Sequence, residues 1–102
     1  MIMDIKALTV EMNKFVAAQG WYEPDSPKQQ TLRNLAISLS LETAEVLEHF
    51  QWSDQDIDAE ELSRELADVT LYLLQIASVA DIDLEQAILR KLAHNYGRDW
   101  EG

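Results

Sequence analysis

The sequence contains no cysteine, and it has only two prolines and three glycines in 102 residues. Without cysteine there is no disulfide framework, no thiolate zinc site and no thiol catalysis, which fits a reducing, cytoplasmic compartment. Long apolar runs are also missing. The longest stretch without a charged residue covers positions 69–80, well short of the roughly 20 residues that cross a bilayer. Charged residues interrupt the apolar pattern at the N-terminus, so we expect neither a membrane protein nor an exported one.

Basic residues are scarce as well. The sequence has 8 lysines and arginines against 19 aspartates and glutamates, and its formal net charge is −11. Nucleic acid polymers and anionic membranes attract proteins with a basic face, so we expect neither as a partner. A small anionic ligand would need an accompanying metal cation. Apolar residues make up 47% of the chain, as in ordinary globular proteins, and we predict a single domain over residues 1–102.

Apolar residues recur with the 3.6-residue period of a helix in four segments, and no segment alternates like a β-strand. We therefore predict an all-α fold, a four-helix bundle-like protomer whose second and third helices are antiparallel because a short connector joins them. The second half of the third helix is apolar nearly all round, which favours burial against another copy of the chain and hence a homo-oligomer. The four segments cover residues 5–19, about 29–50, about 60–80 and 84–96.

Two pairs of acidic residues occur in matching apolar surroundings, 23 residues apart. Glu42 and Glu45 form the first pair, and Glu65 and Asp68 form the second. Residues three apart on a helix are surface neighbours, about 5–6 Å apart at Cβ, so each pair places two carboxylates side by side. If the two helices pack antiparallel, all four carboxylates converge. The residues that flank the two acidic pairs also match at the same offset: Leu39 with Leu62, Ser40 with Ser63, Ala44 with Ala67, and Val46 with Val69.

Four carboxylates at the edge of a core need either protons or a hard cation to offset their repulsion. Mg²⁺ and Mn²⁺ prefer oxygen ligands, and Mg²⁺ is commonly bound by carboxylates together with substrate phosphates. This arrangement predicts metal-assisted displacement at phosphorus, with one carboxylate accepting the proton of the attacking water. A single acidic pair on a helix is usually a solvated face, whereas the repetition favours a metal site.

The order Glu42-x-x-Glu45 followed by Glu65-x-x-Asp68 is similar to the signature of the MazG-like, all-α nucleoside triphosphate pyrophosphohydrolases. The similarity covers about residues 21–95 and resembles in particular the small dCTP pyrophosphatase branch of that family. The other residues that carry the resemblance are Arg33-Asn34-Leu35, Phe50-Gln51-Trp52, Tyr72, Lys91 and Asn95.

This resemblance implies hydrolysis of a nucleoside triphosphate, usually a deoxynucleotide, between the α- and β-phosphates, which cleanses the nucleotide pool. It implies Mg²⁺ as cofactor, with Mn²⁺ as an alternative, and a homodimer or homotetramer whose active sites borrow residues from a neighbouring subunit. It leaves the preferred base open, with dCTP as one candidate. The implied metal ligands are Glu42, Glu45, Glu65 and Asp68, with Glu42 or Glu45 activating the water. The implied substrate contacts are Trp21 and Trp52 on the base, Tyr72 near the sugar, Lys91 and Asn95 at phosphate or sugar, and Arg98 as a further cation.

An alternative interpretation of the sequence involves no catalysis. The apolar third helix alone is typical of a helical homo-oligomeric interaction module, which would be indifferent to Mg²⁺ and nucleotides. Under that reading Trp52 and Tyr72 are core aromatics, and Lys91 is a cation favoured by its helix dipole.

Overall fold

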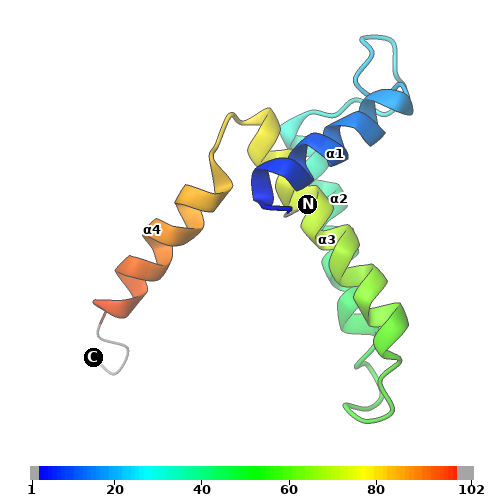
Figure 1. The fold of residues 1–102 in the computed structure, drawn as a ribbon. Helices are drawn as coiled ribbons and strands as arrows, with labels where there is room; N and C mark the ends of the chain where they lie inside the picture. The colour runs from blue at the N-terminus through cyan, green and yellow to red at the C-terminus, as the bar shows by residue number, and fades with distance from the viewer. Residues whose placement is uncertain (1–2, 99–102) are drawn as a thin grey trace.

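The computed structural model describes residues 3–98, and it consists of four helices joined by loops (Figure 1). No strand occurs among the described residues, so the predicted all-α class is confirmed. The helices are α1 (Ile5–Ala18), α2 (Leu32–Glu48), α3 (Ala59–Val79) and α4 (Leu84–Tyr96).

Each helix begins at a side chain that accepts a hydrogen bond from a backbone N–H of the first turn. Asp4 accepts from Ala7 at 2.8 Å, and Asp83 accepts from Gln86 at 3.1 Å. Such caps satisfy N–H groups that have no partner inside the helix. Helix α2 starts later than its periodicity predicts, because the Thr31 hydroxyl accepts from the Asn34 amide and caps it there.

Helices α2 and α3 lie side by side and run in opposite directions, with the connector 49–58 at one end (Figure 1). Helix α1 packs against the other end of α3. The buried apolar cluster lies at this second contact and consists of Met12, Val16 and Leu74. Because α1 and the α2–α3 pair are fixed to each other here, the loop 19–31 that joins α1 to α2 is held against the pair.

Helix α4 leaves the other three and extends away from the α2–α3 pair (Figure 1). No residue of α4 is buried. The radius of gyration is 16.4 Å, against about 13 Å for a compact domain of 100 residues. The bundle-like arrangement therefore holds for three helices and not for the fourth, because the turn after α3, where Asp81 has a φ of +56°, directs the chain outward.

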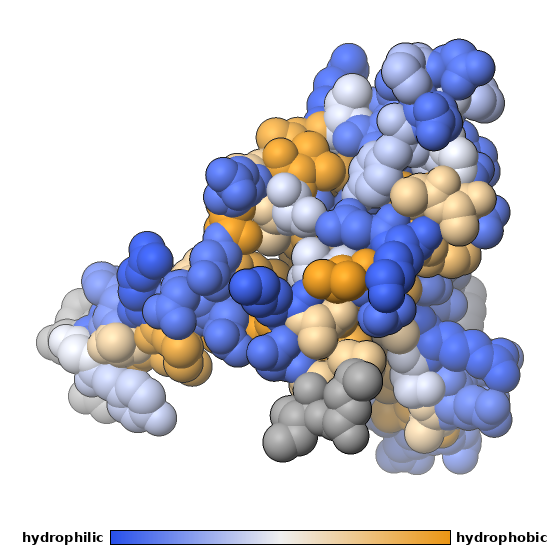
Figure 2. All heavy atoms as spheres, turned by 45° about the horizontal axis from the view of Figure 1, so that its top comes forward, coloured by the Kyte–Doolittle hydropathy of each residue, from blue (hydrophilic) through white to orange (hydrophobic). Residues whose placement is uncertain are grey.

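Apolar side chains reach the surface in patches between hydrophilic ones (Figure 2). The accessible surface is 8120 Å², whereas a folded monomer of this mass exposes about 5,900 Å². Between residues 3 and 98, no helix combines the length and apolarity needed to span a membrane.

Candidate functional site

Three of the four predicted acidic residues converge where α2 and α3 face each other. Glu42 and Glu45 come from α2 and Glu65 comes from α3, and one carboxylate oxygen of each lies within 4.8 Å of the other two. The spacing of three residues on α2 places its two carboxylates on one face, as the sequence predicts. Asp68, one turn beyond Glu65, is outside this group and lines a neighbouring pocket together with Glu42.

The electrostatics of the acidic cluster, Glu42, Glu45 and Glu65, favour protons or a cation. Burial raises the pKa of Glu42, and the negative charges of Glu45 and Asp68 raise it further. The pKa of Glu65 is raised chiefly by a hydrogen bond with the Glu45 side chain, then by burial. Glu45 thus lies between the other two and interacts with both. A divalent cation would remove the cause of these shifts, because it favours the charged carboxylates.

Two oxygens of the cluster fit a metal ion directly. Oε2 of Glu42 and Oε2 of Glu65 are buried, and neither has a hydrogen-bond partner among the described residues. A buried carboxylate oxygen without a donor is costly unless something else satisfies it. The donors here are all carboxylate oxygens, which is the chemistry that Mg²⁺ and Mn²⁺ prefer.

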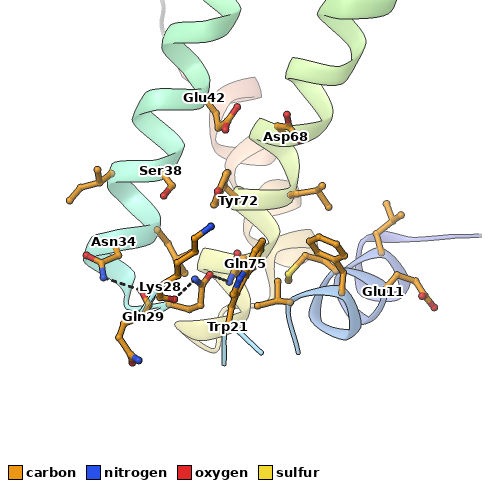
Figure 3. A pocket seen from close by; sticks show the side chains of 18 of the residues that line it. Glu11, Trp21, Lys28, Gln29, Asn34, Ser38, Glu42, Asp68, Tyr72 and Gln75 are labelled. Carbon is orange, nitrogen blue, oxygen red and sulfur yellow. Dashed lines mark hydrogen bonds between the residues drawn. The ribbon is translucent and has the colours of Figure 1, made fainter. Parts of the chain in front are cut away.

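A pocket of about 720 Å³ opens next to the cluster. Glu42 and Asp68 lie at one end of it, Tyr72 lies in the middle, and Gln75 and Trp21 lie at the other end (Figure 3). Helices α1, α2 and α3 and the loop before α2 all contribute to its walls. The volume is in the range of pockets that bind small molecules and cofactors.

The far end of the pocket combines aromatic and apolar side chains with polar ones, among them Lys28, Gln29 and Gln75 (Figure 3). The rings of Phe15 and Trp21 meet edge to face, with centroids 5.7 Å apart, and the Lys28 ammonium lies 5.1 Å from the centre of the Trp21 ring. Met12 and Val16 of the buried core also line this end. The pocket therefore joins an acidic end that fits a cation to an end that fits a flat apolar group.

The structure separates the predicted substrate residues into two groups. Trp21 and Tyr72 line the pocket. Trp52 follows α2 and is 89% exposed, outside the pocket lining. Lys91 and Asn95 belong to α4, and Arg98 lies just beyond it, so all three are on the part of the chain that extends away from α2 and α3.

Sequence reasoning missed several polar pocket residues, among them Gln75, Gln30 and Lys28. Gln75 had a visible signal, because it is the one amide in the uncharged stretch 69–80. Its burial, at 4% exposure, makes it unlike an ordinary surface glutamine. Gln30 and Lys28 had no such signal, since both lie in a loop whose path the pattern of residues does not determine.

Comparisons with known proteins identify the family of the chain. Residues 37–99 match the model of the MazG-like family. The dCTP pyrophosphatase 1 of Mus musculus is 34% identical and that of Homo sapiens 32% identical, each over 104 residues that cover 93% of this chain and 56% of the relative. The chain thus spans little more than half the length of these curated relatives.

A solved structure is also similar over nearly its whole length. The crystal structure of a pyrophosphatase from Archaeoglobus fulgidus superimposes with a TM-score of 0.74 at 35% identity, covering 93% of this chain and 91% of that one. The family match covers more than half of the chain and includes all four predicted acidic residues. The chain belongs to the MazG-like family.

Proposed function

We propose that the protein is an Mg²⁺-dependent pyrophosphohydrolase that cleaves a deoxynucleoside triphosphate between its α- and β-phosphates. The observation that carries this proposal is the convergence of Glu42, Glu45 and Glu65 beside a pocket with an aromatic far end. A nucleotide has the same two-ended chemistry, with anionic phosphates on one side and a flat base on the other. The names of the relatives, dCTP pyrophosphatase 1, make dCTP the first substrate to test.

The acidic cluster and Asp68 would hold the metal, which neutralises phosphate charge when bound. Glu42 or Glu45 would accept the proton of the attacking water, and Glu45 is well placed because it is exposed and lies between the other two carboxylates. A positioned general base contributes about 10²- to 10⁴-fold to such a reaction. Trp21 would pack on the base and Tyr72 would contact the sugar.

The proposal includes a second copy of the chain. Lys91, Asn95 and Arg98 extend away from the cluster of their own protomer, and Trp52 is exposed outside its pocket. In a homodimer or homotetramer these residues would approach the phosphates and base bound by the neighbouring copy. The surface supports this assembly, since the chain exposes roughly 2,000 Å² more than a folded monomer of its mass. That excess is of the size that obligate subunit interfaces bury.

The direct test is to incubate the purified protein with dCTP, dUTP, dTTP, dATP and dGTP in turn, with Mg²⁺, and to separate the products by ion exchange. We expect a nucleoside monophosphate and pyrophosphate, and no reaction when EDTA is present. Glu45→Gln should lower the rate at least about 100-fold. Glu48→Gln is the matched control, because Glu48 is exposed one turn further along α2 and lies outside the cluster.

Two results would contradict the proposal. Release of a nucleoside diphosphate and inorganic phosphate would place the cleavage at the wrong bond. Full activity of Glu45→Gln would show that the acidic cluster takes no part in the reaction. No hydrolysis of any nucleotide would instead favour the non-enzymatic interaction module.

A further inference from the structure

Helix α3 carries three polar side chains in a row along the pocket. Asp68, Tyr72 and Gln75 are four and then three residues apart, so they lie on one face of the helix and all line the pocket (Figure 3). From Asp68 to Gln75 the helix rises about 10 Å. In a nucleotide one sugar separates the base from the α-phosphate. If phosphates bind at Asp68, the sugar would lie near Tyr72 and the base near Gln75 and Trp21.

Gln75 is unusual because it is a polar side chain almost completely buried at the far end of the pocket, with 4% of its surface exposed. Its amide nitrogen, Nε2, donates a hydrogen bond to Oε1 of Gln30 at 2.7 Å. Gln30 in turn donates from its own Nε2 to the Lys28 carbonyl oxygen at 2.6 Å. A backbone carbonyl can only accept, so the nitrogen of Gln30 must face Lys28 and its oxygen must face Gln75. This fixes which end of the Gln75 amide points to Gln30.

The Tyr22 hydroxyl lies near the same amide. Burial raises the pKa of the Tyr22 hydroxyl, and a hydrogen bond with the Gln75 side chain partly offsets that rise. Tyr22 is itself held, since its hydroxyl donates to Oδ1 of Asn13 at 2.6 Å. Because the nitrogen of Gln75 is turned toward Gln30, the carbonyl oxygen is the end of the amide that Gln75 can offer to a ligand.

We propose that the carbonyl oxygen of Gln75 selects the base by accepting a hydrogen bond from an exocyclic amine. The site would then take cytosine- or adenine-type bases in preference to uracil and thymine. Uracil presents a carbonyl oxygen where cytosine presents its amine, and two acceptors facing each other in a buried place leave both unsatisfied. This inference rests on the proposed function, because it assumes that phosphates occupy the acidic end. It adds a residue and a chemical reason for the choice of base.

The test compares kcat/KM for dCTP and dUTP, which are nearly the same size, in wild type and Gln75→Met. Methionine keeps the length of the side chain and removes the oxygen. We expect wild type to favour dCTP at least about tenfold. Gln75→Met should lower kcat/KM for dCTP about 10- to 100-fold and leave dUTP within about threefold, so that the preference disappears. Gln55→Met, the same change at an exposed position of the α2–α3 connector, should keep the preference.

A purely structural role for Gln75 would lower both activities in the same proportion, so an unchanged dCTP to dUTP ratio in Gln75→Met overturns the inference. A wild type that prefers dUTP or dTTP to dCTP overturns it too. If Gln75→Met does not fold, Gln75→Asn withdraws the carbonyl by one methylene while keeping the amide, and it should also lower the preference. Failure of the wild type to hydrolyse any nucleotide would count against the proposed function, whereas the other outcomes concern Gln75 alone.

Discussion

A carboxylate oxygen of Glu42 on α2 lies within 4.8 Å of one from Glu65 on α3, and each residue also has a buried oxygen, Oε2, with no hydrogen-bond partner among residues 3–98. The two helices thus bring like charges together where one oxygen of each residue is buried. Such a contact opposes folding unless protons or a cation offset it.

Glu65→Gln should stabilise the metal-free protein at pH 7.5, because it removes one of the repelling charges. In wild type, millimolar Mg²⁺ should raise Tm by at least about 4 °C, the shift that about 1 kcal/mol produces in a domain of this size. The same Mg²⁺ should raise Tm of Glu65→Gln by less than half as much. Thermal unfolding followed by circular dichroism measures both effects, with Glu48→Gln as a control that behaves as wild type. A variant that melts lower than wild type in EDTA and responds fully to Mg²⁺ would contradict a metal role for Glu65.

The stability of the metal-free protein should depend on pH through the same two residues. The pKa values of Glu42 and Glu65 are raised in the folded state above the value of 4.5 for the free side chain. A raised carboxyl pKa means that the folded protein holds protons that the unfolded chain has lost. These extra protons stabilise the folded protein. Their stabilising effect is fully present below about pH 4.5, and it is lost as the pH rises through the folded-state pKa values of Glu42 and Glu65.

Chemical denaturation between pH 4 and 8 in EDTA tests this sign. The difference in unfolding free energy between wild type and the double variant Glu42→Gln, Glu65→Gln isolates the pair from the other acidic groups. The unfolding free energy of wild type should fall relative to that of the double variant as the pH rises. A difference that is constant with pH, or one that grows in favour of wild type, would show that the two carboxyls are not strained by their contact.

Trp21 and Trp52 should respond differently to truncation. Trp21 packs edge to face on Phe15 and against the buried core, so Trp21→Ala should lower the unfolding free energy by about 2 kcal/mol and raise KM for dCTP. Trp21→Phe keeps a ring in the pocket, so it should lower the unfolding free energy less and raise KM less than Trp21→Ala does. Trp52 is 89% exposed, and Trp52→Ala should change stability by less than about 0.5 kcal/mol. Urea unfolding and steady-state kinetics measure the two effects, and an equal loss of unfolding free energy in Trp21→Ala and Trp52→Ala would argue against the assigned pocket.

The exposed apolar side chains of α4 should hold the oligomer together. Leu89 is 53% exposed and Leu92 is 48% exposed in the single chain. Replacing both with glutamate places charges in the proposed interface, and the protein should then sediment as a monomer and lose activity. Arg90→Gln, a polar change on the same helix, should keep the wild-type mass. Analytical ultracentrifugation gives the masses. A wild type that is monomeric and fully active would refute the proposed role of the second copy.

The four helices and the starts of α1 and α4 could be predicted from the sequence because they depend on neighbouring residues. Asp4 and Asp83 cap the helices that follow them, and Gly20 adopts the positive φ of +75° that ends the first helical segment. The pairing of Glu42 with Glu45 is equally local, since two residues three apart on a helix share a face whatever surrounds them.

Only the tertiary structure decided which of these side chains meet. The register between α2 and α3 brings Glu65 to the first pair and leaves Asp68 on the pocket wall, and no local pattern determines that register. The burial of Gln75 depends likewise on where α1 and the following loop pack. Helix α4 was predicted as a helix, but its direction follows from a single turn, because the short-range forces that form a helix do not say where it points.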